Sequence, residues 1–109
     1  MHKYQTKTEF NAYLLCTNYP EELQKTMLNA IETVETATKG GAESYLIIAE
    51  DEAQARAVEK EYALSGCYPE SDTPIPTENG EVWRERVFIF SNDGGGIIYF
   101  ERVKNSDEK

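Results

Sequence analysis

The feature that most constrains the fold lies near the C-terminus, where three consecutive glycines separate two apolar segments. Residues 88–100 read FIFSNDGGGIIYF, and the residues on both sides of the glycines are mainly β-branched or aromatic. Side chains of these kinds favour strands. Asp93-Gly94 has the composition of a two-residue type I′ turn, which requires positive φ at both central positions. We therefore predict a β-hairpin whose turn spans residues 92–95.

A phosphate-binding loop is the alternative interpretation of the three glycines. Such loops join a strand to a helix, whose N-terminal amide groups hold the anion. Here a second strand-forming segment follows the glycines, and no lysine comes directly after them. The stretch therefore fits a hairpin turn better than a ligand loop.

Charges on the two strands predict which residues face each other. With Asp93 and Gly94 as the turn, Arg86 faces Glu101 and Glu85 faces Arg102. Opposite charges across a strand pair are stabilising, and a shift by one residue would bring like charges together. We therefore expect this register.

The predicted register makes both faces of the hairpin apolar near the turn, with Phe88 close to Tyr99. Both faces should then be covered, by helices or by another subunit. The two faces hold Val87, Ile89, Ile98 and Phe100 on one side, and Phe88, Phe90, Ile97 and Tyr99 on the other.

Three amphipathic segments predict helices before the hairpin. Thr6-Lys7-Thr8-Glu9 has the form of a capping box and starts a helix over residues 7–17. Pro20 suits the first position of a second helix, which extends to about residue 38 and ends at two glycines. Asp51 and Gln54 form a second capping pair, for a third helix that ends near residues 65–66.

The remaining segments complete an α+β prediction. The segment 44–49 is short and rich in residues that favour strands, which is typical of a buried strand. Residues 67–81 contain three prolines and are expected to form a long loop. We predict a single domain over residues 1–109, in the order α-α-β-α-β-β, with a three-stranded sheet whose C-terminal hairpin packs against helices. Residues 1–5 and 105–109 are expected to be flexible tails.

The net charge of −9 is concentrated in one stretch of the chain. Residues 43–81 contain ten acidic residues against Arg56 and Lys60, a local net charge of −8. With no basic patch to displace counterions, direct binding to nucleic acid is disfavoured. No apolar run is long enough to span a membrane, and the first residues lack the apolar core of a signal peptide, so we expect a cytoplasmic protein without membrane contact.

The inventory of reactive side chains argues against an enzyme. Cys16 and Cys67 lie 51 positions apart, and His2 is the sole histidine, so neither a zinc site nor an activated thiol is expected. The adjacent acids at residues 50–52 fit the start of a helix better than a cation site. We predict no catalytic residue, no metal and no cofactor.

Trp83 and the stretch FIFSNDGGGIIYF resemble the SMI1/KNR4 (SUKH) superfamily. In that superfamily a strand that ends in a Ser-Asn/Asp-Gly-Gly-Gly-like turn is followed by a second apolar strand. Its members are intracellular α+β proteins, and many neutralise bacterial nuclease-type toxins by binding them. The resemblance implies a small binding protein of bacterial or phage type.

These observations favour a protein-binding module of inhibitor or immunity type. We expect residues 67–81 and the third helix to contact a basic partner protein, with acidic side chains providing steering and aromatic ones providing anchors. Two alternatives stay open: a homo-oligomeric accessory protein that dimerises through an apolar sheet face, and an inhibitor that mimics DNA. The residues predicted for the contact are Tyr68, Glu70, Asp72, Glu78 and Trp83.

Overall fold

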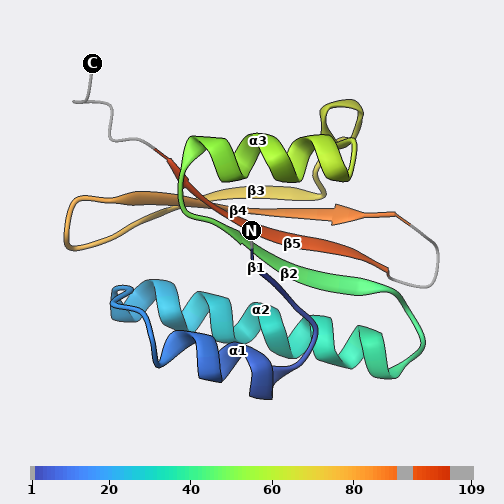
Figure 1. Cartoon of the computed structure of the whole chain (residues 1–109), viewed down its shortest axis with the longest axis horizontal. Helices are drawn as coiled ribbons and strands as arrows, with labels where there is room; N and C mark the ends of the chain where they lie inside the picture. Colours follow the sequence, from blue (N-terminus) through green and yellow to red (C-terminus); the bar gives the residue numbers. More distant parts are fainter. Residues whose placement is uncertain (1, 91–94, 104–109) are drawn as a thin grey trace.

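The computed structural model describes residues 2–90 and 95–103, which form a mixed five-stranded sheet with helices on both faces (Figure 1). The strand order is β1-β2-β5-β4-β3, in which β2 and β5 are parallel and the other neighbours are antiparallel. The elements are β1 (His2–Tyr4), α1 (Lys7–Leu14), α2 (Glu21–Lys39), β2 (Ser44–Ala49), α3 (Glu52–Glu61), the 3₁₀ helix η1 (Leu64–Gly66), β3 (Ser71–Pro76), β4 (Val82–Ile89) and β5 (Gly96–Val103).

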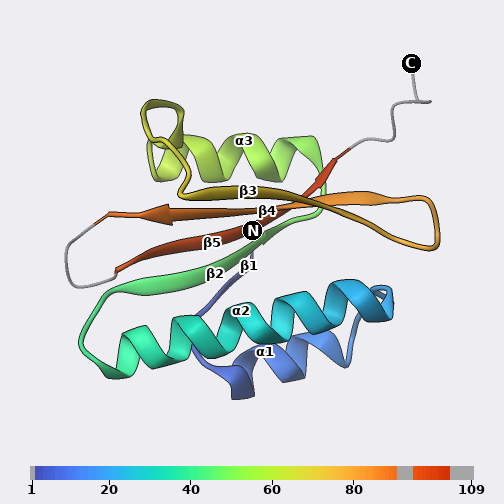
Figure 2. The ribbon, with the colours of Figure 1, turned by 180° about the vertical axis from the view of Figure 1, so that it is seen from behind.

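The helices lie in two layers, with α1 and α2 on one face of the sheet and α3 on the other (Figures 1 and 2). Leu46, Ile48 and Phe100 point into the layer of α1 and α2, where they pack with buried residues such as Met27 and Ile31. On the opposite face a second apolar cluster joins the sheet to α3 and η1, and it includes Ile47, Val58, Leu64, Phe88 and Tyr99. Helices thus cover the hairpin at Phe88, Ile97, Ile98 and Tyr99. Ile89 and Phe90, beside the turn, are about half exposed, so the expectation that both faces are covered is met only in part.

The predicted helix starts are confirmed to within one residue. The Thr6 side chain accepts a hydrogen bond from the backbone N–H of Glu9, and the Asp51 side chain accepts one from that of Gln54. Pro20 immediately precedes the first residue of α2, which ends before Gly40. The ends differ from the prediction, because α1 stops at Leu14 and α3 at Glu61.

The prediction of three strands is wrong, because the sheet has two further strands, one at each edge. β1 lies in the segment expected to be a flexible tail, and it pairs with residues 46–48 of β2. β3 lies in the stretch expected to be a loop, and it pairs along its whole length with β4. The three residues of β1 are too few to show the alternation of apolar and polar residues that indicates a strand. In β3 the two prolines argued against a strand, because proline cannot donate a backbone hydrogen bond.

The C-terminal hairpin is confirmed, but its register differs by two residues from the predicted one. Arg84 faces Glu101, Arg86 faces Tyr99, and Trp83 faces Arg102. A shift by two keeps every side chain on its predicted face, and Arg86 still reaches Glu101 diagonally, with Nη2 and Oε1 3.7 Å apart. Charge pairing alone therefore could not distinguish the two registers.

The predicted turn at residues 92–95 lies mostly outside the described residues. Phe90 and Gly95 flank residues 91–94, and the backbone N–H of Phe90 donates a hydrogen bond to the carbonyl oxygen of Gly95 at 2.8 Å. The register then pairs Ile89 with Gly96.

Candidate functional site

β3 separates the residues that were predicted to form one contact site. Tyr68 and Glu70 precede this strand, and Glu78 follows it in the turn to β4. A strand rises about 3.3 Å per residue, so the six residues of β3 place the two groups about 20 Å apart, at opposite ends of the sheet. The predicted loop is therefore not one surface.

Two of the predicted site residues have structural partners. The Asp72 carboxylate receives two hydrogen bonds from Arg84, from Nε and Nη2, each at 2.9 Å. Trp83 is fully buried in the core, where its ring meets Tyr19 edge-on with 5.2 Å between the ring centroids. Tyr68, Glu70 and Glu78 are exposed.

The end of the sheet that contains Glu78 gathers acidic residues from three distant parts of the chain. The backbone N–H of Glu78 donates to Oε1 of Glu22, 56 positions away, at 2.9 Å. This turn therefore lies beside the start of α2, and a pocket also brings it next to the residue that links β2 to α3. We call this region the acidic end, and its acidic members are Glu21, Glu22, Glu50, Asp51, Glu52, Glu78 and Glu81.

The acidic end keeps a negative charge after its ion pairs are counted. Three basic residues form ion pairs there: Lys25 with Glu21, Arg56 with Glu52 and Arg102 with Glu81. Seven acidic and three basic residues give the acidic end a net charge of −4. Four of the acids lie in or next to the first turns of α2 and α3, where the helix dipole favours negative charge. Glu78 and Glu81 belong to a turn between strands and have no such explanation.

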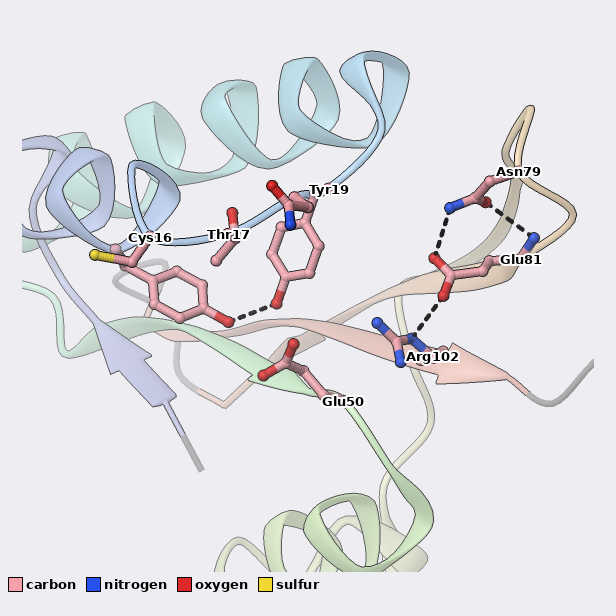
Figure 3. Close-up of a pocket in the computed structure, with 9 residues that line it drawn as sticks. Cys16, Thr17, Tyr19, Glu50, Asn79, Glu81 and Arg102 are labelled. Atoms are coloured by element: carbon pink, nitrogen blue, oxygen red, sulfur yellow. Dashed lines mark hydrogen bonds and ion pairs between the residues drawn. The ribbon is translucent and has the colours of Figure 1, made fainter.

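A pocket of about 460 Å³ opens within the acidic end, at the carboxyl ends of the parallel strands β2 and β5 (Figure 3). In open sheets with parallel strands, ligands commonly bind outside the carboxyl ends of the strands. Four segments supply the walls: the end of α1 with the connection to α2, the residue after β2, the β3–β4 turn, and the end of β5. Residues with polar side chains that line it include Tyr13, Tyr19, Glu50, Asn79, Glu81 and Arg102.

Two tyrosines form one wall of this pocket. The hydroxyl groups of Tyr13 and Tyr19 share a hydrogen bond, and Glu50 points towards the Tyr19 hydroxyl (Figure 3). Burial raises the pKa of Tyr19, and its hydrogen bonds with Tyr13 and Glu50 raise it further. Burial also raises the pKa of Tyr13, although the hydrogen bond with Tyr19 opposes this effect. Both phenols therefore stay protonated at neutral pH, and the pocket wall is uncharged apart from Glu50.

Arg102 and Glu81 form the opposite wall. Nε of Arg102 lies 3.4 Å from Oε2 of Glu81, while Oε1 of Glu81 accepts a hydrogen bond from Asn79 (Figure 3). The Arg102 guanidinium also lies over the ring of Trp83, 5.1 Å from its centroid. Nε of Arg102 is buried and has no hydrogen-bond partner among the described residues.

The other end of the sheet is apolar. Of the four exposed large hydrophobic residues in the described chain, three lie where β3 begins and β4 ends: Tyr68, Ile89 and Phe90. Tyr68 is 98% exposed, and Ile89 and Phe90 are about half exposed. We call these three residues the apolar end.

Sequence reasoning missed most of the pocket. Glu50 was interpreted as a helix-start acid and Arg102 as a hairpin charge. Glu50 follows a predicted strand directly, which is where ligand-binding residues collect when the strand is parallel to a neighbour. That signal could be used only once β2 and β5 were known to be parallel.

Residues 2–90 and 95–103 contain no group of three His, Cys, Asp or Glu side chains that could hold a metal ion. Across the same described ranges, none of the helices is both long and apolar enough to cross a membrane. Comparison with protein-family models, with curated proteins and with solved structures finds no match. The resemblance to the SMI1/KNR4 superfamily therefore stays a prediction.

Proposed function

We propose that this chain is a small protein-binding module, of inhibitor or immunity type, whose acidic end contacts a basic surface of another protein. The observation that carries the proposal is the gathering of acids from α2, α3 and the β3–β4 turn at one end of the sheet. Local helix effects account for part of this charge, but they do not account for Glu78 and Glu81.

The expected contribution of this charge is mainly to the rate of association. A surface of one sign attracts an oppositely charged partner over several ångströms, and salt weakens this attraction. Exposed ion pairs add little affinity by themselves, typically about 0–1 kcal/mol each. A stable complex therefore also needs contacts that exclude water.

A second candidate function rests on the apolar end. Exposed Tyr68, Ile89 and Phe90 favour the alternative in which two copies associate. Helices cover much of both sheet faces, so the contact in this alternative would use these three residues at the end of the sheet.

The test compares two triple variants that remove the same charge from opposite ends. Glu21→Gln, Glu52→Gln and Glu78→Gln neutralise the acidic end, while Glu43→Gln, Glu61→Gln and Glu70→Gln neutralise acids elsewhere. The probe is an octa-arginine peptide, and stopped-flow mixing gives its association rate at low and high salt. We expect the first triple to slow association about tenfold at low salt and to flatten the salt dependence. The second triple should change the rate about twofold or less.

Equal effects of the two triples would contradict the proposal. The net charge alone would then govern the attraction, and the acidic residues would serve solubility. Far-UV circular dichroism of both variants controls for folding. Glu22 and Asp51 are left unchanged because they accept structural hydrogen bonds.

A further inference from the structure

The pocket in the acidic end has a composition that fits a cation. Its charged members are Glu50, Glu81 and Arg102, so carboxylates outnumber the guanidinium by two to one. The side chains of Tyr13, Tyr19 and Thr17 add hydroxyl oxygens, which can accept hydrogen bonds. Arg102 is held against Glu81, so Glu50 gives the pocket its net negative charge, which favours a cation over an anion.

Two tyrosines contribute to the lining of the pocket. Tyr13 lies in it half-buried beside Tyr19, with 6.1 Å between the ring centroids. A cation over the face of an aromatic ring is attracted by the electrons of the ring. The protein already uses this geometry next to the pocket, where the Arg102 guanidinium lies over Trp83 and against Glu81.

We propose that this pocket receives the guanidinium group of an arginine side chain on the basic partner, an inference that rests on the proposed function. The guanidinium enters beside Glu50, in the space between the tyrosine wall and the wall formed by Arg102 and Glu81 (Figure 3). Arginine suits the site better than lysine because its planar group is weakly hydrated, stacks on aromatic rings and donates to carboxylates in pairs. The pocket would thereby provide the water-excluding contact that a stable complex needs in addition to the exposed charges.

The experiment uses N-acetyl-arginine amide as the probe and N-acetyl-citrulline amide as its uncharged isostere. Binding is followed by the NMR shifts of the tyrosine ring protons and by the fluorescence of Trp83, the single tryptophan of the chain. We expect the arginine probe to shift the Tyr13 and Tyr19 signals and to change the fluorescence, because Arg102 lies over the Trp83 ring. The citrulline probe should bind about tenfold more weakly or not at all.

Matched variants locate the binding. Glu50→Gln should weaken the arginine probe about tenfold, while Glu43→Gln, which removes one charge at the start of β2, should leave its affinity within about twofold. Tyr13→Phe removes a hydroxyl and keeps the ring, so it should weaken binding about threefold and provides a second test if Glu50→Gln does not fold.

Two outcomes would overturn the inference: equal binding of the arginine and citrulline probes, or equal effects of Glu50→Gln and Glu43→Gln. Its failure is distinguishable from failure of the proposed function. If the acidic end speeds the association of octa-arginine but the arginine probe shifts no tyrosine signal, the inference about the pocket is wrong and the proposed function stands. If the arginine probe shifts the tyrosine signals but the acidic end does not speed the association of octa-arginine, the pocket binds arginine and the proposed function is wrong.

Discussion

At the residue scale, Gly96 is the glycine whose lack of a side chain matters most among the described residues. It pairs with Ile89 at the start of β5, and its backbone N–H donates to the carbonyl oxygen of Glu43 at 3.0 Å. A Cβ atom at this position would lie 2.0 Å from the carbonyl oxygen of Phe88. The constraint is therefore close backbone approach between strands rather than an unusual φ.

Gly96→Ala should destabilise the fold by about 1–3 kcal/mol, because the added methyl group forces β4 and β5 apart. Urea unfolding followed by circular dichroism measures the change. Gly66→Ala is the control, because a Cβ atom there meets nothing within 4 Å, and it should change stability by about 0.5 kcal/mol or less. A Gly96→Ala variant as stable as Gly66→Ala would show that the hairpin relaxes at no cost.

At the scale of elements, β3 shows how a strand with two prolines can occupy the edge of a sheet. The backbone N–H of Thr77 donates to Glu81, and this bond continues the register of β3 with β4. Because N–H groups alternate in direction along a strand, the odd-numbered residues of β3 face β4 and Pro74 and Pro76 face outwards. The prolines remove donors from the free edge without removing any bond to β4, which protects the edge from pairing with another chain.

Replacing both prolines, as Pro74→Thr with Pro76→Thr, should promote self-association because it restores two outward N–H groups. Sedimentation velocity over a range of protein concentrations should show a rise in average mass for the double variant. Pro69→Thr changes a proline outside β3 and should leave the mass unchanged. Identical behaviour of the two variants would mean that another feature protects this edge.

At the scale of the whole molecule, the sheet separates two kinds of surface. The acidic end and its pocket lie where β2 and β5 end, and the apolar end lies where β3 begins and β4 ends (Figure 1). The two candidate functions therefore use different ends and make different predictions for the size of the particle in solution.

We expect the chain to be a monomer at micromolar concentration. The three exposed side chains of the apolar end offer far less area than the roughly 800 Å² per partner that stable interfaces bury. Size-exclusion chromatography with light scattering measures the mass of the wild type and of the Ile89→Ser, Phe90→Ser double variant. A wild-type dimer that the double variant converts to a monomer would favour self-association as the function.

The local elements were predictable because their signals lie within a few neighbouring residues. The capping groups at Thr6 and Asp51, the apolar strand at residues 44–49 and the faces of the C-terminal hairpin all follow from such patterns. β3 escaped this reasoning because its identity as a strand depends on β4 beside it, which pairs with it along its whole length.

The candidate site could be predicted only in part, for the same physical reason. Sequence alone indicated an acidic segment and exposed Tyr68 and Glu70, but it placed Trp83 in the contact, where the fold buries it. Only the tertiary structure separated Glu70 from Glu78 and brought Tyr19, Glu50 and Arg102 to one pocket. These positions depend on strand order and on the parallel pairing of β2 with β5, which joins segments about fifty residues apart and leaves no local pattern in the chain.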